Sequence, residues 1–214
     1  TYEHVPPETV GNARKVLVST QAGKSNVISE LERVGIAAAR DDPRVLRLLD
    51  TIKQKEAVGY AYEGADASFV LLAKGVLGQA PHFFDVERYR VGVERRHNAL
   101  GELIAVADAT VKVNIDGQTI ISAAEGNGPV NALDVALRKD LGRYQSYIEG
   151  VRLSDYRVRV FQGGTDAVTR VLIESKDDSG ERWTTVGVSA NVIDASFEAL
   201  VDSINYKLLI SGAT

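Results

Sequence analysis

This chain contains no cysteine, no long apolar run and no surplus of basic residues. Without cysteine it has neither disulfide bonds nor thiolate metal sites, which favours an intracellular protein. No stretch of about 18 apolar residues is present, which excludes a membrane-spanning helix. The formal net charge of -4, with both signs interspersed, gives no basic surface for nucleic acid. We therefore expect a cytoplasmic protein with no nucleic-acid or membrane partner.

Catalytic motifs are equally scarce. The three histidines, His4, His82 and His97, have no metal-ligand spacing, so we expect no metal site built from this chain alone. The segment Gly23-Lys24-Ser25 matches the end of a phosphate-binding loop, but Val18 stands where the earlier glycine is needed, so we interpret it as a polar turn. No nucleophile has a base beside it in sequence, which makes a free-standing enzyme the less favoured interpretation.

The composition is that of an ordinary globular protein. With 214 residues, 44% hydrophobic and 25% charged, the chain can form one domain with an appendage or two small domains. It begins at Thr1 rather than at methionine, and no secretory segment follows. We interpret it as a piece of a longer protein.

A repeat organises the second half of the chain. The stretch from Asp108 to Leu141 recurs 63 positions later, so that Gly117 matches Gly180, Gly128 matches Asn191 and Val130 matches Ile193. Such a repeat indicates duplicated supersecondary units that bury their apolar faces against each other. Each unit is predicted to be three strands followed by one helix.

The apolar spacing predicts an α+β protein with three parts. Residues 1–27 form a tail or linker subdomain, residues 28–80 a helical linker subdomain with three helices between Val27 and Leu77, and residues 81–214 a duplicated βββα domain. A hairpin loop is expected at Asn98–Glu102. The strand from Asp155 to Phe161 is expected to place Val158 and Val160 inward.

Both predicted helix starts carry anion-binding chemistry. Pro129 suits the first helical position with Gly128 or Asn127 as the cap, and Asn191 caps the second helix. Free backbone N–H groups at a helix start suit a carboxylate, and the neighbouring side chains are small or aliphatic. An aliphatic amino acid fits both features. Alternatively, the glycines only permit a tight strand-to-helix turn.

Several sequence blocks, spread over nearly the whole chain, resemble one enzyme family. They are Tyr2-Glu3-His4-x-x-Pro7, Val10-Gly11-Asn12, Ala22-Gly23-Lys24-Ser25-Asn26, Gly64-Ala65-Asp66-Ala67-Ser68-Phe69, Ala124-Glu125-Gly126-Asn127-Gly128-Pro129, Asp155-Tyr156 and Glu181-Arg182-Trp183-Thr184-Thr185-Val186-Gly187-Val188. Together they resemble the C-terminal part of the 2-isopropylmalate, homocitrate and citramalate synthase family, with Ala65-Asp66-Ala67-Ser68-Phe69 most similar to the citramalate branch.

This resemblance implies a regulatory and dimerisation region that follows an absent catalytic TIM barrel. In the family, that barrel holds a divalent metal and condenses acetyl-CoA with a 2-oxo acid, which is pyruvate in the citramalate branch. The last domain binds an end-product amino acid, isoleucine or leucine, near the interface of a homodimer. No cofactor is expected in this fragment itself. A 2-isopropylmalate synthase region that responds to leucine, and a dimerisation module without a ligand, are the alternatives.

The resemblance also assigns residues. Tyr2 matches a tyrosine that reaches an active site in the dimer, although a packing role is equally open. The effector residues it implies are Gly126, Asn127, Gly128, Pro129, Val130, Leu153, Tyr156, Val160, Thr165 and Ala167, with Ala190 and Val192 from the second copy.

Overall fold

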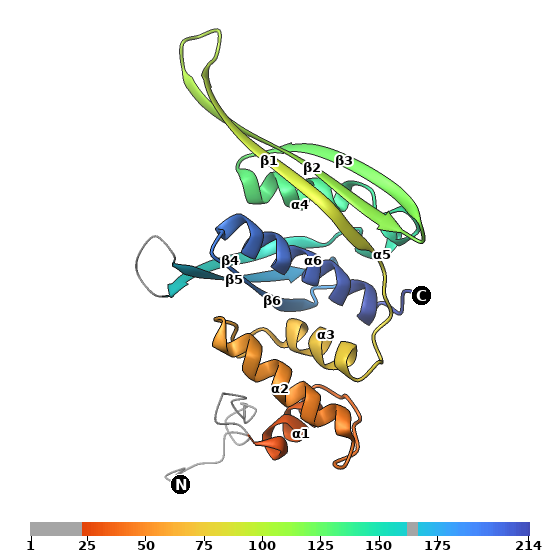
Figure 1. Cartoon of the computed structure of the whole chain (residues 1–214). Coiled ribbons are helices and arrows are strands. Elements are labelled where there is room, and N and C mark those ends of the chain that lie inside the picture. Colours follow the sequence, from red (N-terminus) through yellow and green to blue (C-terminus); the bar gives the residue numbers. More distant parts are fainter. Residues whose placement is uncertain (1–22, 162–166) are drawn as a thin grey trace.

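The structure is a computed structural model that describes residues 23–161 and 167–214. Within these residues the chain forms two three-stranded antiparallel sheets and six α-helices (Figure 1). The predicted α+β class with a duplicated βββα arrangement is therefore confirmed. No helix in these two ranges is long and apolar enough to cross a bilayer.

Three helices come first, as the apolar spacing predicted, and we call them the linker helices. They are α1 (Lys24–Arg33), α2 (Pro43–Ala57) and α3 (Asp66–Val76). Asp42 caps α2 by accepting a hydrogen bond from the Arg44 N–H, and Pro43 occupies the first helical position. The polar turn predicted at residues 23–26 is wrong, because Gly23 is the N-cap of α1. Its carbonyl accepts from the Asn26 and Val27 N–H groups, so Lys24, Ser25 and Asn26 form the first helical turn.

The first βββα unit consists of β1 (Asp85–His97), β2 (Leu103–Ile115), β3 (Gln118–Gly126) and α4 (Pro129–Lys139). Asp116 and Gly117 both have positive φ, at 52° and 82°, as a two-residue hairpin turn requires. The predicted loop at residues 98–102 joins β1 to β2.

A two-stranded extension projects from this first sheet. Strand β3 ends at Gly126, opposite Ala107, whereas β1 and β2 remain paired as far as His97 and Leu103. We call residues 93–106 the hairpin arm, which extends away from the rest of the molecule in Figure 1. Two strands alone are marginally stable in water, so the arm is a surface that a partner would stabilise.

The second unit repeats the order with β4 (Arg152–Phe161), β5 (Val168–Lys176), β6 (Arg182–Ser189) and α6 (Val192–Ile210). The N-caps of α4 and α6 are Gly128 and Asn191, the pair that the repeat predicts. A short 3₁₀ helix (Gly142–Tyr144) and α5 (Gln145–Ile148) connect the two units. The sequence did not predict this connection, because its apolar residues are too few for a periodic signal.

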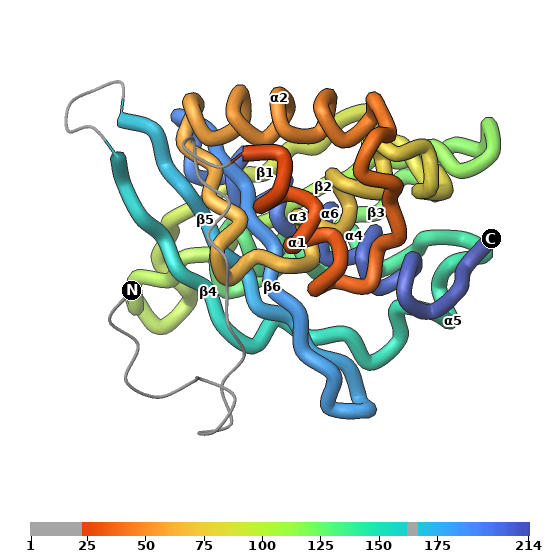
Figure 2. Tube along the Cα trace, turned by 90° about the horizontal axis from the view of Figure 1, so that it is seen from below, coloured from red at the N-terminus to blue at the C-terminus, as the bar shows by residue number. Residues whose placement is uncertain are grey.

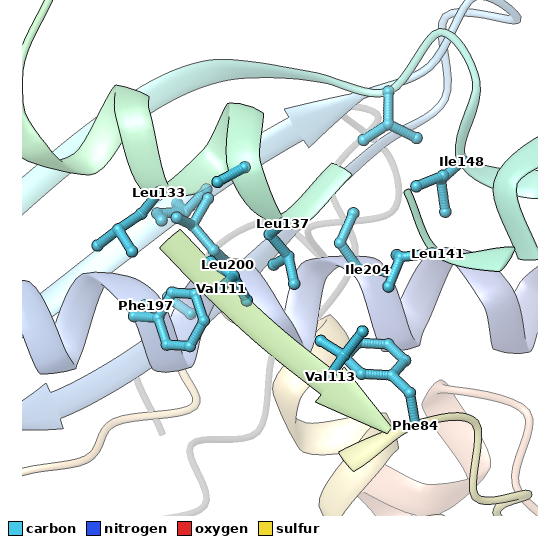
Figure 3. Packing of buried hydrophobic residues seen from close by; sticks show 14 of the residues in the cluster. Phe84, Val111, Val113, Leu133, Leu137, Leu141, Ile148, Phe197, Leu200 and Ile204 are labelled. Atoms are coloured by element: carbon cyan, nitrogen blue, oxygen red, sulfur yellow. The ribbon is translucent and has the colours of Figure 1, made fainter. Parts of the chain in front are cut away.

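Helices α4 and α6 lie between the two sheets, and the linker helices lie at the β6 edge of the second sheet, where α3 contacts both β6 and α6 (Figures 1 and 2). Leu133 and Leu137 of α4 and Leu200 of α6 meet Val111 and Val113 of β2 in one cluster (Figure 3). This cluster also includes Val171 and Ile173 of β5, so both units share a single core.

Two glycines allow each helix to touch the strand before it. A Cβ at Gly126 would lie 2.5 Å from the Ala132 nitrogen at the start of α4. A Cβ at Gly187 would overlap the Ala195 carbonyl oxygen and lie 3.0 Å from the Ala199 nitrogen in α6. Because these neighbours are backbone atoms, they cannot move aside as a flexible side chain would.

Val158 and Val160 differ from the prediction. They pair with Val171 and Thr169, so they do point to the inner face of their sheet. Their side chains are nevertheless 42% and 64% exposed, because α6 covers β5 and β6 but not this end of β4. The alternating pattern identified the face of the strand correctly but not its coverage.

The linker joins the second sheet through the free edge of β6. The Ser68 hydroxyl of α3 accepts from the Val186 N–H at 3.0 Å and donates to Asp202 of α6 at 2.7 Å. Glu198 accepts from the Val188 N–H at 2.9 Å and from the Tyr60 hydroxyl. These bonds satisfy edge N–H groups that would otherwise be available to another strand.

Substitution of Gly187 tests the contact between β6 and α6. We expect Gly187→Ala to lower the free energy of unfolding by about 3 kcal/mol or more, because two backbone segments would have to separate. Gly75→Ala is the matched control, since Gly75 lies in α3 with no atom within 4 Å of its Cβ position. It is expected to raise stability by up to about 1 kcal/mol. Urea unfolding of both variants measures the difference, and equal stabilities would contradict the close contact.

Candidate functional site

The helices of the two βββα units begin at the same end of the molecule. Helices α4 and α6 run side by side in the same direction, and both start on the left in Figure 1. We call this end, with the last residues of β3, β4 and β6, the helix-start end. It contains most of the residues that the sequence predicts for an effector site.

The start of α4 has unused hydrogen-bond donors. Gly128 is the N-cap, and no side chain in residues 23–161 and 167–214 caps the helix. The Ala132 N–H bonds to the Gly128 carbonyl, and Pro129 has no N–H, so the free donors of the first turn are those of Val130 and Asn131. Two adjacent N–H groups at the positive end of a helix dipole can hold a carboxylate.

The start of α6 is less available to an anion. The Asn191 side chain accepts from the Ile193 N–H at 2.9 Å, as predicted for this cap. Asp194 lies in the first turn and accepts a hydrogen bond from the Tyr89 hydroxyl. The negative charge of Asp194 repels an incoming anion, so the start of α4 is the better site for a carboxylate.

Gly126 and Gly128 serve different purposes. Gly126 is required for packing, because the first turn of α4 leaves no room for a Cβ there. Gly128 has an extended backbone with φ of -177° and no atom within 4 Å of its Cβ position. The fold therefore requires a glycine at position 126 but not at position 128, where open space lies beside the free N–H groups.

Asn127 and Asn131 close the turn between β3 and α4. The Asn127 N–H donates to the Asn131 side-chain oxygen at 3.1 Å, and Asn127 itself is exposed. Asn131 was not predicted as a site residue. Its place in the first turn, three residues after the cap, is the sequence signal that could have identified it.

Aliphatic and aromatic groups lie near the helix starts. The Tyr156 hydroxyl is 2.8 Å from the Ser196 hydroxyl, which donates to the Val192 carbonyl at 2.6 Å. Tyr156 of β4 is therefore held against the first turns of α6. Val130 and Tyr156 both pack on the main core, whereas Val160 and Val192 are exposed.

Leu153 does not join this group. It precedes Val160 by seven residues on one strand, which at roughly 3.3 Å per residue separates them by about 23 Å. At the end of β4 where Leu153 lies, the Arg138 side chain from the last turn of α4 donates a hydrogen bond to the Val151 carbonyl. Within one chain, a single amino acid cannot contact both Leu153 and the helix-start end.

Two of the remaining predicted residues, Ala167 and Ala190, lie within the described ranges. Ala190 is exposed just before α6, and Ala167 immediately precedes β5. Tyr2 and Thr165 lie outside the described residues. Four of the cavities in the described ranges have no predicted effector residue in their lining. In residues 23–161 and 167–214, no three histidine or acidic side chains form a group able to hold a metal ion.

One buried charge lies on α4 below the candidate site. Burial raises the pKa of Asp134, and the paired Arg138 opposes that shift. Asp134 faces the interior rather than the free N–H groups, so its function is structural.

The fold and the repeat agree with one protein family. The sequence model described as the LeuA allosteric (dimerisation) domain matches residues 63–208. The chain therefore belongs to the LeuA allosteric domain family. The match includes α3, the first βββα unit and the second unit as far as residue 208 in α6.

Individual relatives point to one branch of enzymes. The chain is 47% identical to an (R)-citramalate synthase of Synechocystis over 100% of its length, and 49% identical to one of Geobacter sulfurreducens over 97%. A probable 2-isopropylmalate synthase of Methanosarcina acetivorans is 30% identical over 93% of the chain. The chain spans 40%, 39% and 36% of these relatives. It is thus similar to the regulatory part of citramalate synthases, as its sequence blocks predicted.

Substitution of Asn191 and of Asn127 by alanine distinguishes a helix-capping residue from a loop residue. We expect Asn191→Ala to lower the free energy of unfolding by about 1 kcal/mol, because the Ile193 N–H loses its acceptor. Asn127→Ala should change it by less than about 0.5 kcal/mol, since its side chain is exposed. Thermal unfolding of both variants provides the test, and a larger loss for Asn127→Ala would reverse the assignment.

Proposed function

We propose that this chain is the feedback-regulatory and dimerisation region of a citramalate synthase-like enzyme. The effector is a branched-chain amino acid such as isoleucine. The observation that carries this proposal is the uncapped start of α4, where two free N–H groups adjoin open space at Gly128. The family match and the similarity to (R)-citramalate synthases support it.

The proposed binding mode uses each end of the ligand differently. The carboxylate accepts hydrogen bonds from the Val130 and Asn131 N–H groups. The aliphatic side chain lies toward Val160 and Val192, and Tyr156 forms the base of the site. Because Val160 and Val192 are exposed in one chain, a second copy completes the apolar wall.

The dimer surface is proposed at the same end. The inner face of the arm continues past the helix starts, where Val93 and Leu103 are 59% and 55% exposed. Val158 and Val160 extend the inner face of the second sheet in the same way. These four exposed apolar side chains lie on the inner faces of the two sheets, and burying those of the arm would stabilise it.

Regulation requires that the ligand distinguish two states of the protein. A ligand at the dimer surface changes how two copies pair. The linker helices are fastened to the second sheet at β6, so a change in pairing would reach the linker through Ser68 and Glu198. In the longer enzyme, we propose that the linker passes this change to a barrel that condenses acetyl-CoA with pyruvate in the cytoplasm.

A substitution that imitates the ligand tests the carboxylate site. In Gly128→Asp, the new carboxylate can cap the Val130 and Asn131 N–H groups of its own helix. We expect isoleucine affinity to fall at least about tenfold. Stability should stay equal or rise by roughly 0.3 kcal/mol, because Asp is a good N-cap. Titration calorimetry and thermal unfolding measure the two effects.

Gly128→Ala is the matched control, because it adds volume without a carboxylate and should retain most of the affinity. Leucine and valine belong in the same titrations. Tighter binding of leucine would favour a 2-isopropylmalate synthase type of region, consistent with the 30% identical relative. Absence of heat with all three amino acids would leave a dimerisation module and contradict effector binding.

Charges on the arm test the dimer surface. We expect the double variant Val93→Asp, Leu103→Asp to be monomeric at micromolar concentration, where the parent chain is dimeric, because two buried carboxylates would oppose pairing. Leu46→Asp is the control, since Leu46 is exposed on α2, away from this end. Light scattering gives the masses. A monomeric parent, or a double variant that remains dimeric with native circular dichroism, would contradict the surface.

A further inference from the structure

A cavity of about 370 Å³ lies where the linker meets the second regulatory unit. Its walls come from the end of α2, the segment 58–65, α3, β6 and α6. It has no lining residue in common with the candidate effector site. The polar contacts that fasten α3 to β6 lie in its wall.

Two carboxylates, Glu198 and Asp202, line this cavity one helical turn apart on α6. One oxygen of Asp202 accepts from Ser68. Glu198 accepts from Tyr60 and from the Val188 N–H. The only lysine or arginine in the lining is Lys55, whose Nζ lies 3.8 Å from Glu198. Asp202 therefore has an oxygen without a cationic partner in the described part of the chain.

An unused hydroxyl group faces the same space. Tyr62 lines the cavity and is only 8% exposed. Its ring is fixed by Tyr60 and Phe69, with ring centroids 6.2 Å and 6.1 Å away. Yet within the described ranges its hydroxyl makes no hydrogen bond. Because Tyr62 lines the cavity, this hydroxyl can bond a polar group of a ligand there.

The rest of the wall is apolar. Leu71, Leu72 and Val76 of α3 line the cavity, together with Val186 of β6. A ligand that complements this wall has an aliphatic body with one cationic end that donates hydrogen bonds. A primary ammonium group has three N–H donors, which can bond the Asp202 carboxylate, the Glu198 carboxylate and the Tyr62 oxygen.

We propose that this cavity binds a small aliphatic primary ammonium ion, held between Asp202, Glu198 and the Tyr62 hydroxyl. The ligand would lie across the contact between the linker and the regulatory unit. Its binding would therefore strengthen the attachment of α3 to α6, separately from any effector at the helix-start end.

The ionisation of Asp202 gives this site a pH dependence. Burial raises the pKa of Asp202 to about 6, Glu198 adds to that shift, and Ser68 and Lys55 oppose it. The other charged group near Tyr62 is Glu56 of α2. Asp202 also borders two adjacent cavities, whose ionisable side chains are His82, Asp85, Glu87, Arg88, Asp194 and Glu198. A bound ammonium favours the ionised Asp202, so affinity should rise as pH increases from 5 to 7.5.

Isobutylammonium chloride is the probe, and isobutanol is the uncharged control of the same shape. Both are titrated into the 214-residue chain, with binding followed by calorimetry and by the backbone amide signals of Ser68 and Val186. The amine stays protonated over this pH range, because alkyl amines titrate near pH 10. We expect saturable binding of one amine per chain, at least about tenfold tighter than isobutanol. It should weaken at pH 5.

Asp202→Asn should weaken amine binding at least about tenfold, whereas Asp50→Asn, at an exposed position of α2, should leave it unchanged. Tyr62→Phe retains the ring and removes the hydroxyl group, so it tests the site even if Asp202→Asn fails to fold. It should weaken binding about threefold or more. Gly128→Asp should not affect the amine, which separates this site from the proposed effector site. No saturable binding, equal binding of isobutanol, or binding insensitive to both cavity variants would overturn the proposal.

Discussion

The direct contact between a strand glycine and the helix that follows it is the constraint on which both regulatory units depend. Gly126 places the backbone of β3 against the start of α4, and Gly187 does the same for β6 and α6. Because no side chain intervenes, each helix is fixed close to its own sheet. The two helices then fit side by side between the sheets, and both start at one end of the molecule. The candidate site is a consequence of this packing.

The two units differ at the starts of their helices, which are equivalent positions in the repeat. The α6 start is capped by Asn191 and carries Asp194, whereas the α4 start has a glycine cap and no acid in its first turn. Among the described residues, the duplicated fold therefore presents one helix start with a side-chain cap and an acid, and one helix start with neither. This difference, more than the duplication itself, supports a single carboxylate site in each chain.

Much of the fold could be predicted from the sequence, because helix caps, hairpin turns and apolar spacing are local signals. Pro129 and Asn191 each marked the start of a helix correctly. Coverage is not a local signal, so the exposure of Val158 and Val160 could not be predicted. The start of α1 was missed because its first turn has the composition of a loop.

The candidate site was predictable only in part. Repeat and turn chemistry located the helix starts, but which end of β4 lies beside them depends on how β4 pairs with β5. The cavity at the linker combines Tyr62 with Glu198 and Asp202, more than 130 positions later in the chain. Those acids carry no recognisable motif, and only the docking of α3 on α6 brings them together.

The central claim is that a carboxylate binds at the start of α4. Hydrogen–deuterium exchange of the 214-residue chain, with and without saturating isoleucine, tests it most directly. The account predicts slower exchange at the Val130 and Asn131 amides, with little change at the capped Ile193 amide. Unchanged exchange at Val130 and Asn131, with isoleucine bound by an independent measure, would contradict it.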